Sequence, residues 1–175
     1  GGYGHLIDDE GSGYAIGRDI LTVAVQTFDK RIANSILLEL LLEKINGSTV
    51  EDIVHYTYRS NWNKANIAKL APLILKAYNE GDVCSIQICK NAVNELVKLV
   101  LPTAKILNLR DGILTLLGGI LTHYEPIKAM LIHKLSVLLP TLKIVSPKYD
   151  SATGAAMIAL ARYNNLESND STGMI

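Results

Sequence analysis

Residues 1–13 read GGYGHLIDDEGSG and are the most distinctive segment of the chain. Its glycines surround a histidine and three consecutive acidic residues, and an apolar helical pattern follows at once. Glycine permits positive φ angles and lets the backbone approach a ligand closely. Directly before a helix, such a loop can aim backbone N–H groups and a fixed carboxylate at a polar small molecule. The segment therefore predicts a ligand-binding loop.

Length and composition indicate one globular domain. The chain has 175 residues, of which 49% are hydrophobic and 19% charged, a composition typical of folded proteins. Lys+Arg and Asp+Glu both number 17, so the zero net charge indicates neither nucleic acid nor an anionic membrane as a partner. No signal peptide is recognisable, and charged residues and Pro102 interrupt the most apolar region, 97–121. We expect a cytoplasmic protein that does not span a membrane.

The cysteines and histidines do not have the spacing of a metal site. Cys84 and Cys89 are the two cysteines, and their spacing fits neither a disulfide framework nor a zinc motif. We expect both to be small buried side chains in a reducing compartment. His55, His123 and His133 are scattered along the chain, so no metal ligand is predicted within it.

Hydrophobic periodicity predicts that the first part of the chain is mainly helical. Ser12 is the expected cap of the first helix, and Ser48-Thr49-Val50-Glu51 has the pattern of a capping box for the third. Pro72 is expected to kink the fourth helix or to lie within its first turns. The expected helices span 14–28, 33–45, a short segment after Thr49 through His55 or Tyr58, 64–79 and 83–100.

The period changes in the last third of the chain. Short apolar runs at 113–117 and 142–145 predict buried strands. Helices are expected after each strand, one opened by a capping box at 122–125 and continuing to about Leu138, the other over 151–163. This order predicts a parallel pair with a right-handed crossover. Two strands do not form a sheet that stands alone, so we expect a partner sheet outside this chain or upstream of it.

Gly118 and Gly119 lie where the first strand meets a helix. Unpaired amides and the helix dipole at such a junction favour a phosphate or a nucleotide. A glycine pair after a strand is also common as a tight turn. Both interpretations stay open on these residues alone.

Residues 1–5, followed by Asp9-Glu10-Gly11-Ser12, resemble the sugar-site motif of N-acetylglucosamine kinases and the related BadF/BadG-type ATPases. In that family a glycine–aromatic–glycine–histidine segment leads into Gly-Asp-Glu-Gly-Ser and a helix. Asp8 stands where the family usually has a glycine, and an aspartate adopts positive φ less readily. Weaker similarity extends over residues 67–71, 80–82, 116–120 and 154–156.

The resemblance implies an α/β fold of the actin-like (ribonuclease-H-like) kinase superfamily. Residues 1–175 would form its C-terminal lobe, mostly helical with two short parallel strands. Within this single domain we expect a substrate loop at 1–13 and a helical region at 14–101. A strand–helix–strand–helix nucleotide side is expected at 113–163, followed by a polar tail that frays at 164–175.

The resemblance also implies that part of the catalytic machinery lies elsewhere. In the family, an Asp-Gly-Gly-Thr phosphate loop, a carboxylate base and a Gly-Thr-Gly loop all precede the glycine–histidine motif. None of them occurs in this sequence. We therefore expect an N-terminal lobe upstream, no catalytic residue within the chain and no phosphoryl transfer by the chain alone.

The implied function is ATP-dependent phosphorylation of N-acetylglucosamine to its 6-phosphate, with ATP and Mg²⁺ as cofactors. Asp9 would accept hydrogen bonds from the sugar hydroxyls, and Gly2, Tyr3 and Gly4 would line the same amino-sugar site. His5 would orient a sugar hydroxyl or have a structural role. A homodimer stays open at this point.

The nucleotide contacts implied by the resemblance fall on Ala68 or Lys69, Gly118 and Gly119. Two alternatives remain within the same fold. One is an ATPase that activates another enzyme. The other is a non-catalytic member that binds a sugar or a nucleotide.

Overall fold

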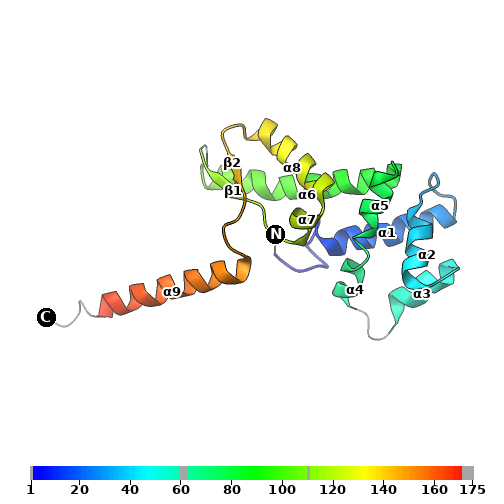
Figure 1. Cartoon of the computed structure of the whole chain (residues 1–175), viewed down its shortest axis with the longest axis horizontal. Helices are drawn as coiled ribbons and strands as arrows, with labels where there is room; N and C mark the ends of the chain where they lie inside the picture. Colours follow the sequence, from blue (N-terminus) through cyan, green and yellow to red (C-terminus); the bar gives the residue numbers. More distant parts are fainter. Residues whose placement is uncertain (1, 60–62, 110, 171–175) are drawn as a thin grey trace.

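The computed structural model describes residues 2–59, 63–109 and 111–170, with side chains as far as residue 163. Gly1 of the expected substrate loop and residues 171–175 of the expected tail lie outside this part. The helices and strands, in chain order (Figure 1), are α1 Gly13–Phe28, α2 Leu37–Ile45, α3 Val50–Tyr58, α4 Lys64–Ala68, α5 Leu73–Asn79, α6 Val83–Ile106, β1 Ile113–Thr115, α7 Gly119–His123, α8 Glu125–Leu138, β2 Lys143–Val145 and α9 Ser151–Asp170.

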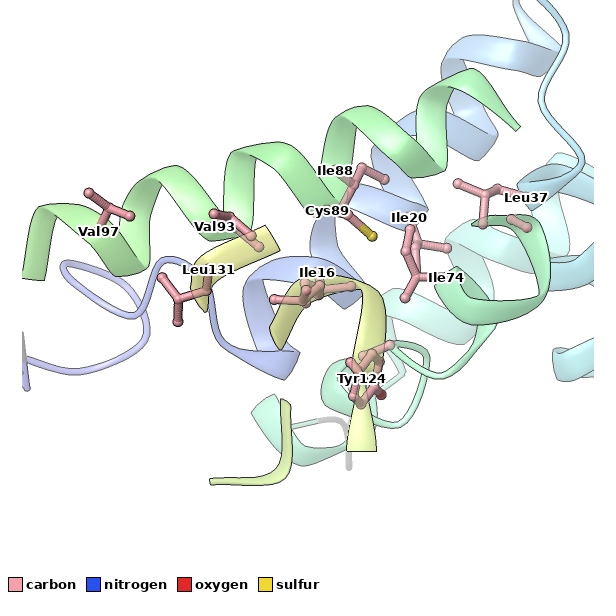
Figure 2. Packing of buried hydrophobic residues seen from close by; sticks show 14 of the residues in the cluster. Ile16, Ile20, Leu37, Ile74, Ile88, Cys89, Val93, Val97, Tyr124 and Leu131 are labelled. Atoms are coloured by element: carbon pink, nitrogen blue, oxygen red, sulfur yellow. The ribbon is translucent and has the colours of Figure 1, made fainter. Parts of the chain in front are cut away.

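The long helix α6 is the axis of the core. Figure 2 shows its buried side chains facing those of α1, α5 and α8. Ile16 and Ile20 of α1 and Leu131 of α8 are almost completely buried in this cluster, as is Cys89 of α6. A second, smaller cluster joins α1 to α2 and α3. Burial of this apolar surface is the main force that holds the helices together.

Asp82 fixes the start of α6 and ties it to α2. Its carboxylate accepts a hydrogen bond from the Ser85 N–H at 2.7 Å, which caps the helix. The other carboxylate oxygen accepts one from the Ile36 N–H at 3.1 Å, one residue before α2 begins. The Asp82 side chain therefore both caps α6 and makes a long-range contact.

Helices α1 and α4 pack with their backbones nearly in contact. A Cβ atom at Gly17 would lie 2.1 Å from the carbonyl oxygen of Ile67. Only glycine fits at such a distance. This contact holds α4 next to the first turns of α1, where the substrate loop ends.

The structure corrects several expected helix boundaries. The helix expected over 64–79 is two helices, α4 and α5, and Pro72 is the N-cap of the second because it has no N–H to continue the first. Helix α6 passes through Pro102 and continues to Ile106. Helix α2 begins at Leu37 rather than at residue 33.

Both expected capping boxes are wrong in detail. For α3 the box consists of Thr49 and Asp52, one residue later than expected. Thr122 does not cap α8 either, because it lies inside the short helix α7, and no side chain caps α8 at Tyr124. Pro126 lies in the first turn of α8, where a missing N–H costs no helical hydrogen bond.

The two strands pair in parallel, as expected, but are shorter than the apolar runs. Ile113 pairs with Lys143 and Thr115 with Val145. Along each strand only the middle residue is partly buried, and its neighbours are exposed. Among the described residues, the sheet has no third strand.

Helix α9 projects away from the rest of the structure (Figure 1). It continues to Asp170, so the part of the expected tail from 164 to 170 is helical instead. From Ser151 to Tyr163 every residue except Gly154 is exposed. Within the described part of the chain, no helix is long and apolar enough to cross a membrane.

Candidate functional site

The first half of the substrate loop is a tight, exposed turn. The carbonyl of Gly4 accepts hydrogen bonds from the N–H groups of Ile7 and Asp8, at 3.1 and 2.9 Å. Gly2 and Gly4 have φ angles of +100° and +92°, and a Cβ on either would meet no atom within 4 Å. Glycine is thus required here by backbone conformation, and the space beside it is open to a ligand. Tyr3 is 76% exposed.

His5 connects this turn to α1. Its ring meets the ring of Tyr14 edge to face, with centroids 4.9 Å apart. Such a pair stabilises the turn beyond simple burial of the two rings. This contact is the structural alternative expected for His5.

Asp8 adopts no strained conformation at the position where the family has glycine. The described non-glycine residues with positive φ are Lys30, Asn46 and Asn108, so Asp8 is outside that region. Its backbone forms an isolated antiparallel bridge with Gly4. The substitution is therefore compatible with the turn.

The second half of the loop is fixed against the helices. Gly11, with φ of +81°, is buried against α6, and a Cβ there would lie 3.0 Å from Leu96 Cγ and 3.1 Å from the Ala92 carbonyl oxygen. The Ser12 hydroxyl accepts a hydrogen bond from the Ala15 N–H at 3.2 Å and caps α1, as expected. The loop thus reaches α1 in one defined conformation.

Asp9 is half-buried at the end of the turn. Its backbone carbonyl accepts a hydrogen bond from the Ser12 N–H at 3.2 Å. Within the described part of the chain, no group donates a hydrogen bond to its carboxylate. A partly desolvated carboxylate gains most from a ligand that supplies donors.

A depression of about 300 Å³ lies between this loop and the start of α7. Asp9 and the residues up to Gly13 line one side, and Gly118 and Gly119 lie on the other. Leu96 and Leu99 of α6 contribute an apolar wall. The structure therefore brings Asp9 and the glycine pair, far apart in sequence, to one site.

The glycine pair leaves room for a ligand at this site. Gly118 has a φ of +102°, which side chains other than glycine rarely adopt, and a Cβ on either glycine would meet no atom within 4 Å. The turn needs glycine at Gly118 for its conformation. At Gly119 the lack of a side chain leaves the backbone accessible.

The other expected site residues are not in the lining of the depression. Ala68 is directly behind it, because a Cβ at Gly13 would lie 3.7 Å from both Ala68 Cβ and Ile120 Cδ1. Lys69, the C-cap residue of α4, is exposed. Gly2, Tyr3 and Gly4 belong to the exposed turn and do not line the cavity.

A second, larger cavity, lined only by polar residues, has no counterpart among the features predicted from the sequence. It has a volume of about 600 Å³ and lies between α1, α6 and α8. Glu10 lines both cavities, and in this one its carboxylate pairs with Arg18. Helical spacing gives no signal for this pair, because Glu10 precedes the helix that carries Arg18. The lining residues are Glu10, Arg18, Asp19, Asn91, Asn94, Glu95, Lys98 and Lys134.

The acidic and basic side chains that line the polar cavity are equal in number. Lys98 forms an ion pair with Glu95 at 2.6 Å, and Lys134 donates a hydrogen bond to Asn94. Burial raises the pKa of Asp19, and the neighbouring Arg18 opposes this shift. The cavity therefore does not present a surplus of one charge to a ligand.

In this chain both cysteines favour the protonated thiol. Burial raises the pKa of Cys89 to about 11, and burial, together with Asp82, also raises the pKa of the half-buried Cys84. Thiolate is the form that binds metals, and it is disfavoured at both positions. The described residues contain no group of three or more His, Cys, Asp or Glu side chains that could hold a metal ion.

The amino-acid sequence matches a known protein family over most of its length. Residues 1–159 match the sequence profile of the BadF/BadG/BcrA/BcrD ATPase family. The N-acetylmuramic acid/N-acetylglucosamine kinase of Clostridium acetobutylicum is 37% identical over 161 residues, which are 91% of this chain and 53% of that protein. The N-acetyl-D-glucosamine kinase of Dictyostelium discoideum is 32% identical over 166 residues, 91% of this chain and 51% of the relative.

The structural comparison agrees on the fold. The crystal structure of a candidate N-acetylglucosamine kinase from Chromobacterium violaceum superposes with a TM-score of 0.70, at 23% identity, over 90% of this chain and 50% of that one. The expected actin-like kinase fold, with mostly helices and two parallel strands in this portion, is confirmed. The chain spans about half the length of the curated relatives it matches.

Proposed function

The chain belongs to the BadF/BadG/BcrA/BcrD ATPase family, and from that premise we propose that it forms the sugar-binding loop and part of the nucleotide cleft of an ATP-dependent amino-sugar kinase. The proposed substrate is N-acetylglucosamine, and the proposed product is its 6-phosphate. Two curated relatives named as N-acetylglucosamine kinases support this choice. A cytoplasmic location would give such an enzyme access to ATP.

One observation carries the proposal. Asp9 is a half-buried residue whose carboxylate has no hydrogen-bond donor among the described residues, and it lines the same depression as Gly118 and Gly119. A sugar presents several hydroxyl donors to such a carboxylate. The open backbone of the glycine pair would face the nucleotide. Substrate and nucleotide would therefore meet across one small cavity.

The remaining proposed contacts come from residues outside the lining of this cavity. Gly2, Tyr3 and Gly4, on the exposed turn, would close over the sugar from the side of the loop. Ala68 would approach the nucleotide from behind Gly13 and Ile120. Both assignments agree with the open space beside Gly2 and Gly4 and with the position of Ala68 behind the cavity.

The described residues offer a contact surface for ATP but no group of ligands for Mg²⁺. The glycine pair offers accessible backbone to a nucleotide. The described residues contain no carboxylate cluster suited to Mg²⁺, so no step through the metal is assigned to this chain. When bound, Mg²⁺ would neutralise charge on the transferring phosphoryl group.

We expect the 175-residue chain alone to be inactive. Its sequence contains neither of the two phosphate loops nor the carboxylate base that the family places before the glycine–histidine motif. Positioning and charge neutralisation supply most of the catalysis in phosphoryl transfer, and both depend on those parts. Detectable phosphorylation of N-acetylglucosamine by the isolated chain would contradict this expectation.

The direct test is Asp9→Asn in the protein as expressed from its own gene. We expect kcat/KM for N-acetylglucosamine to fall roughly 10- to 100-fold, because hydrogen bonds to a charged acceptor are each worth about 1.5–3 kcal/mol. Asp8→Asn is the matched control, since it alters the adjacent carboxylate without reaching the cavity lining. An unimpaired Asp9→Asn protein would refute the proposed role of this site.

A further inference from the structure

Glu10, the residue after Asp9, forms a bidentate ion pair with Arg18. The Glu10 carboxylate accepts hydrogen bonds from both terminal nitrogens of Arg18, at 3.0 and 2.9 Å. A bidentate pair of this kind fixes the direction of the carboxylate as well as its distance. Arg18 lies on α1, so the pair ties the loop to a rigid element.

Arg18 is itself held in place. Its guanidinium also reaches Asp19 Oδ1 at 3.4 Å, and Asp19 is half-buried on the same helix. The guanidinium therefore lies between two carboxylates, with a side chain that is 43% exposed. Exposed ion pairs contribute little to folding stability, so stability alone gives no strong reason for this arrangement.

The Glu10–Arg18 ion pair lies at the boundary between the two halves of the substrate loop, where it can fix the backbone next to Asp9. Gly11 and Ser12 fix the backbone on the C-terminal side of Glu10, through α6 and the cap of α1. The turn before Asp9 is exposed and has contacts mainly within itself. Glu10 is thus the side-chain anchor adjacent to Asp9, at the boundary between the fixed and the exposed halves of the loop.

We propose that Arg18 is a positioning residue, which acts through Glu10 to hold the Asp9 carboxylate toward the cavity before the sugar binds. This inference rests on the proposed function of Asp9 as the sugar ligand. Arg18 does not line the cavity that contains Asp9. Its effect is therefore indirect, through the backbone of residues 9–11.

The test is a double-mutant cycle with Arg18→Gln, Glu10→Gln and the double variant, in the protein as expressed from its own gene. Each single variant is expected to raise KM for N-acetylglucosamine about 5- to 20-fold and to leave KM for ATP unchanged. The double variant should be no worse than either single variant. Arg18→Lys, which keeps the charge but not the planar fork, should fall between wild type and Arg18→Gln.

Arg31→Gln is the matched control. Arg31 forms a similarly exposed ion pair with Asp29, at 2.9 Å, just beyond the other end of α1. Its loss should leave KM for the sugar unchanged. An unchanged sugar KM in both Arg18→Gln and Glu10→Gln, with Asp9→Asn impaired, would overturn the positioning role and leave the proposed function intact.

A second measurement separates the two proposals. Arg18→Gln should accelerate amide hydrogen exchange at residues 9–12 in the ligand-free protein, with the midpoint of thermal unfolding unchanged. If Asp9→Asn is unimpaired, the proposed function fails, and accelerated exchange still supports anchoring of the loop by Arg18. Unchanged exchange at these residues overturns the anchoring as well.

Discussion

Gly17 shows how strongly a single residue can depend on a distant part of the chain. The nearest atoms to a Cβ at this position are the carbonyl oxygen and carbon of Ile67, at 2.1 and 2.8 Å. Both are backbone atoms, which cannot move aside as a flexible side chain can. We expect Gly17→Ala to lower the free energy of unfolding by about 2–3 kcal/mol, as measured by urea denaturation.

Gly154→Ala is the matched control for this prediction. Gly154 also lies in a helix, but a Cβ there would meet no atom within 4 Å. Alanine has the higher helix propensity, so this variant should not lose stability. Equal effects of the two substitutions would show that helix propensity, and not contact with α4, governs Gly17. Nothing in the local pattern distinguishes the two glycines.

At the scale of the element, α3 shows what a capping pattern does and does not determine. Ser48 with Glu51 and Thr49 with Asp52 both have the spacing of a capping box. The structure selects the second pair, with Thr49 in an extended conformation. The sequence pattern therefore predicted the existence of the helix start but not its register.

The same element yields a prediction about pH. Asp52 accepts hydrogen bonds from the N–H groups of Ser48 and Thr49, both at 2.9 Å, and from the Thr49 hydroxyl. These bonds hold the pKa of Asp52 below its usual value. Since the folded state favours the charged form, the stabilisation is present above the unfolded pKa and is lost as pH falls through the folded one.

We expect Asp52→Asn to be less stable than wild type at neutral pH and the difference to shrink in acid, as measured by urea unfolding at both. Thr49→Ala should cost about 1 kcal/mol at neutral pH. Glu51→Gln, the residue that the other spacing would assign to the box, should have a smaller effect limited to the helix dipole. A large, pH-dependent loss in Glu51→Gln would contradict the observed register.

At the scale of the whole molecule, α9 contributes little to the packed core. Its side chains up to Tyr163 are almost all exposed, including the apolar Met157, Ile158 and Leu160. A helix without tertiary packing has only its own weak propensity to stabilise it. We therefore expect α9 to be among the least stable parts of this chain.

Removal of residues 151–175 tests this expectation. The midpoint of thermal unfolding of the remaining chain, followed by circular dichroism, should stay within about 2 °C, since a larger shift would require a contribution of several tenths of a kcal/mol or more. Amide hydrogens of α9 should exchange faster than those of α6 in the intact chain. Slow exchange in α9, or a marked fall in the midpoint, would show that α9 packs against the core.

Sequence alone determined the features that depend on neighbouring residues. The glycine–histidine loop, the cap at Ser12, the positions of most helices and the parallel strand pair follow from local periodicity and from the conformations that glycine, serine and proline favour. Those preferences act over a few residues, so they can be recognised in the sequence without knowledge of the packing. The resemblance to the kinase family is carried by such a local segment, residues 1–12.

Only the tertiary structure decided which of these features meet. Packing around α6 places Asp9, Gly118 and Gly119 in the lining of one cavity and sets Gly17 against the backbone of Ile67. The folded loop also brings Glu10 onto Arg18. These contacts join residues that lie far apart in sequence or on opposite sides of a helix start, and their geometry depends on how buried side chains fill the core. Local propensities carry no information about that packing, and so the loop was predictable while the cavity it lines was not.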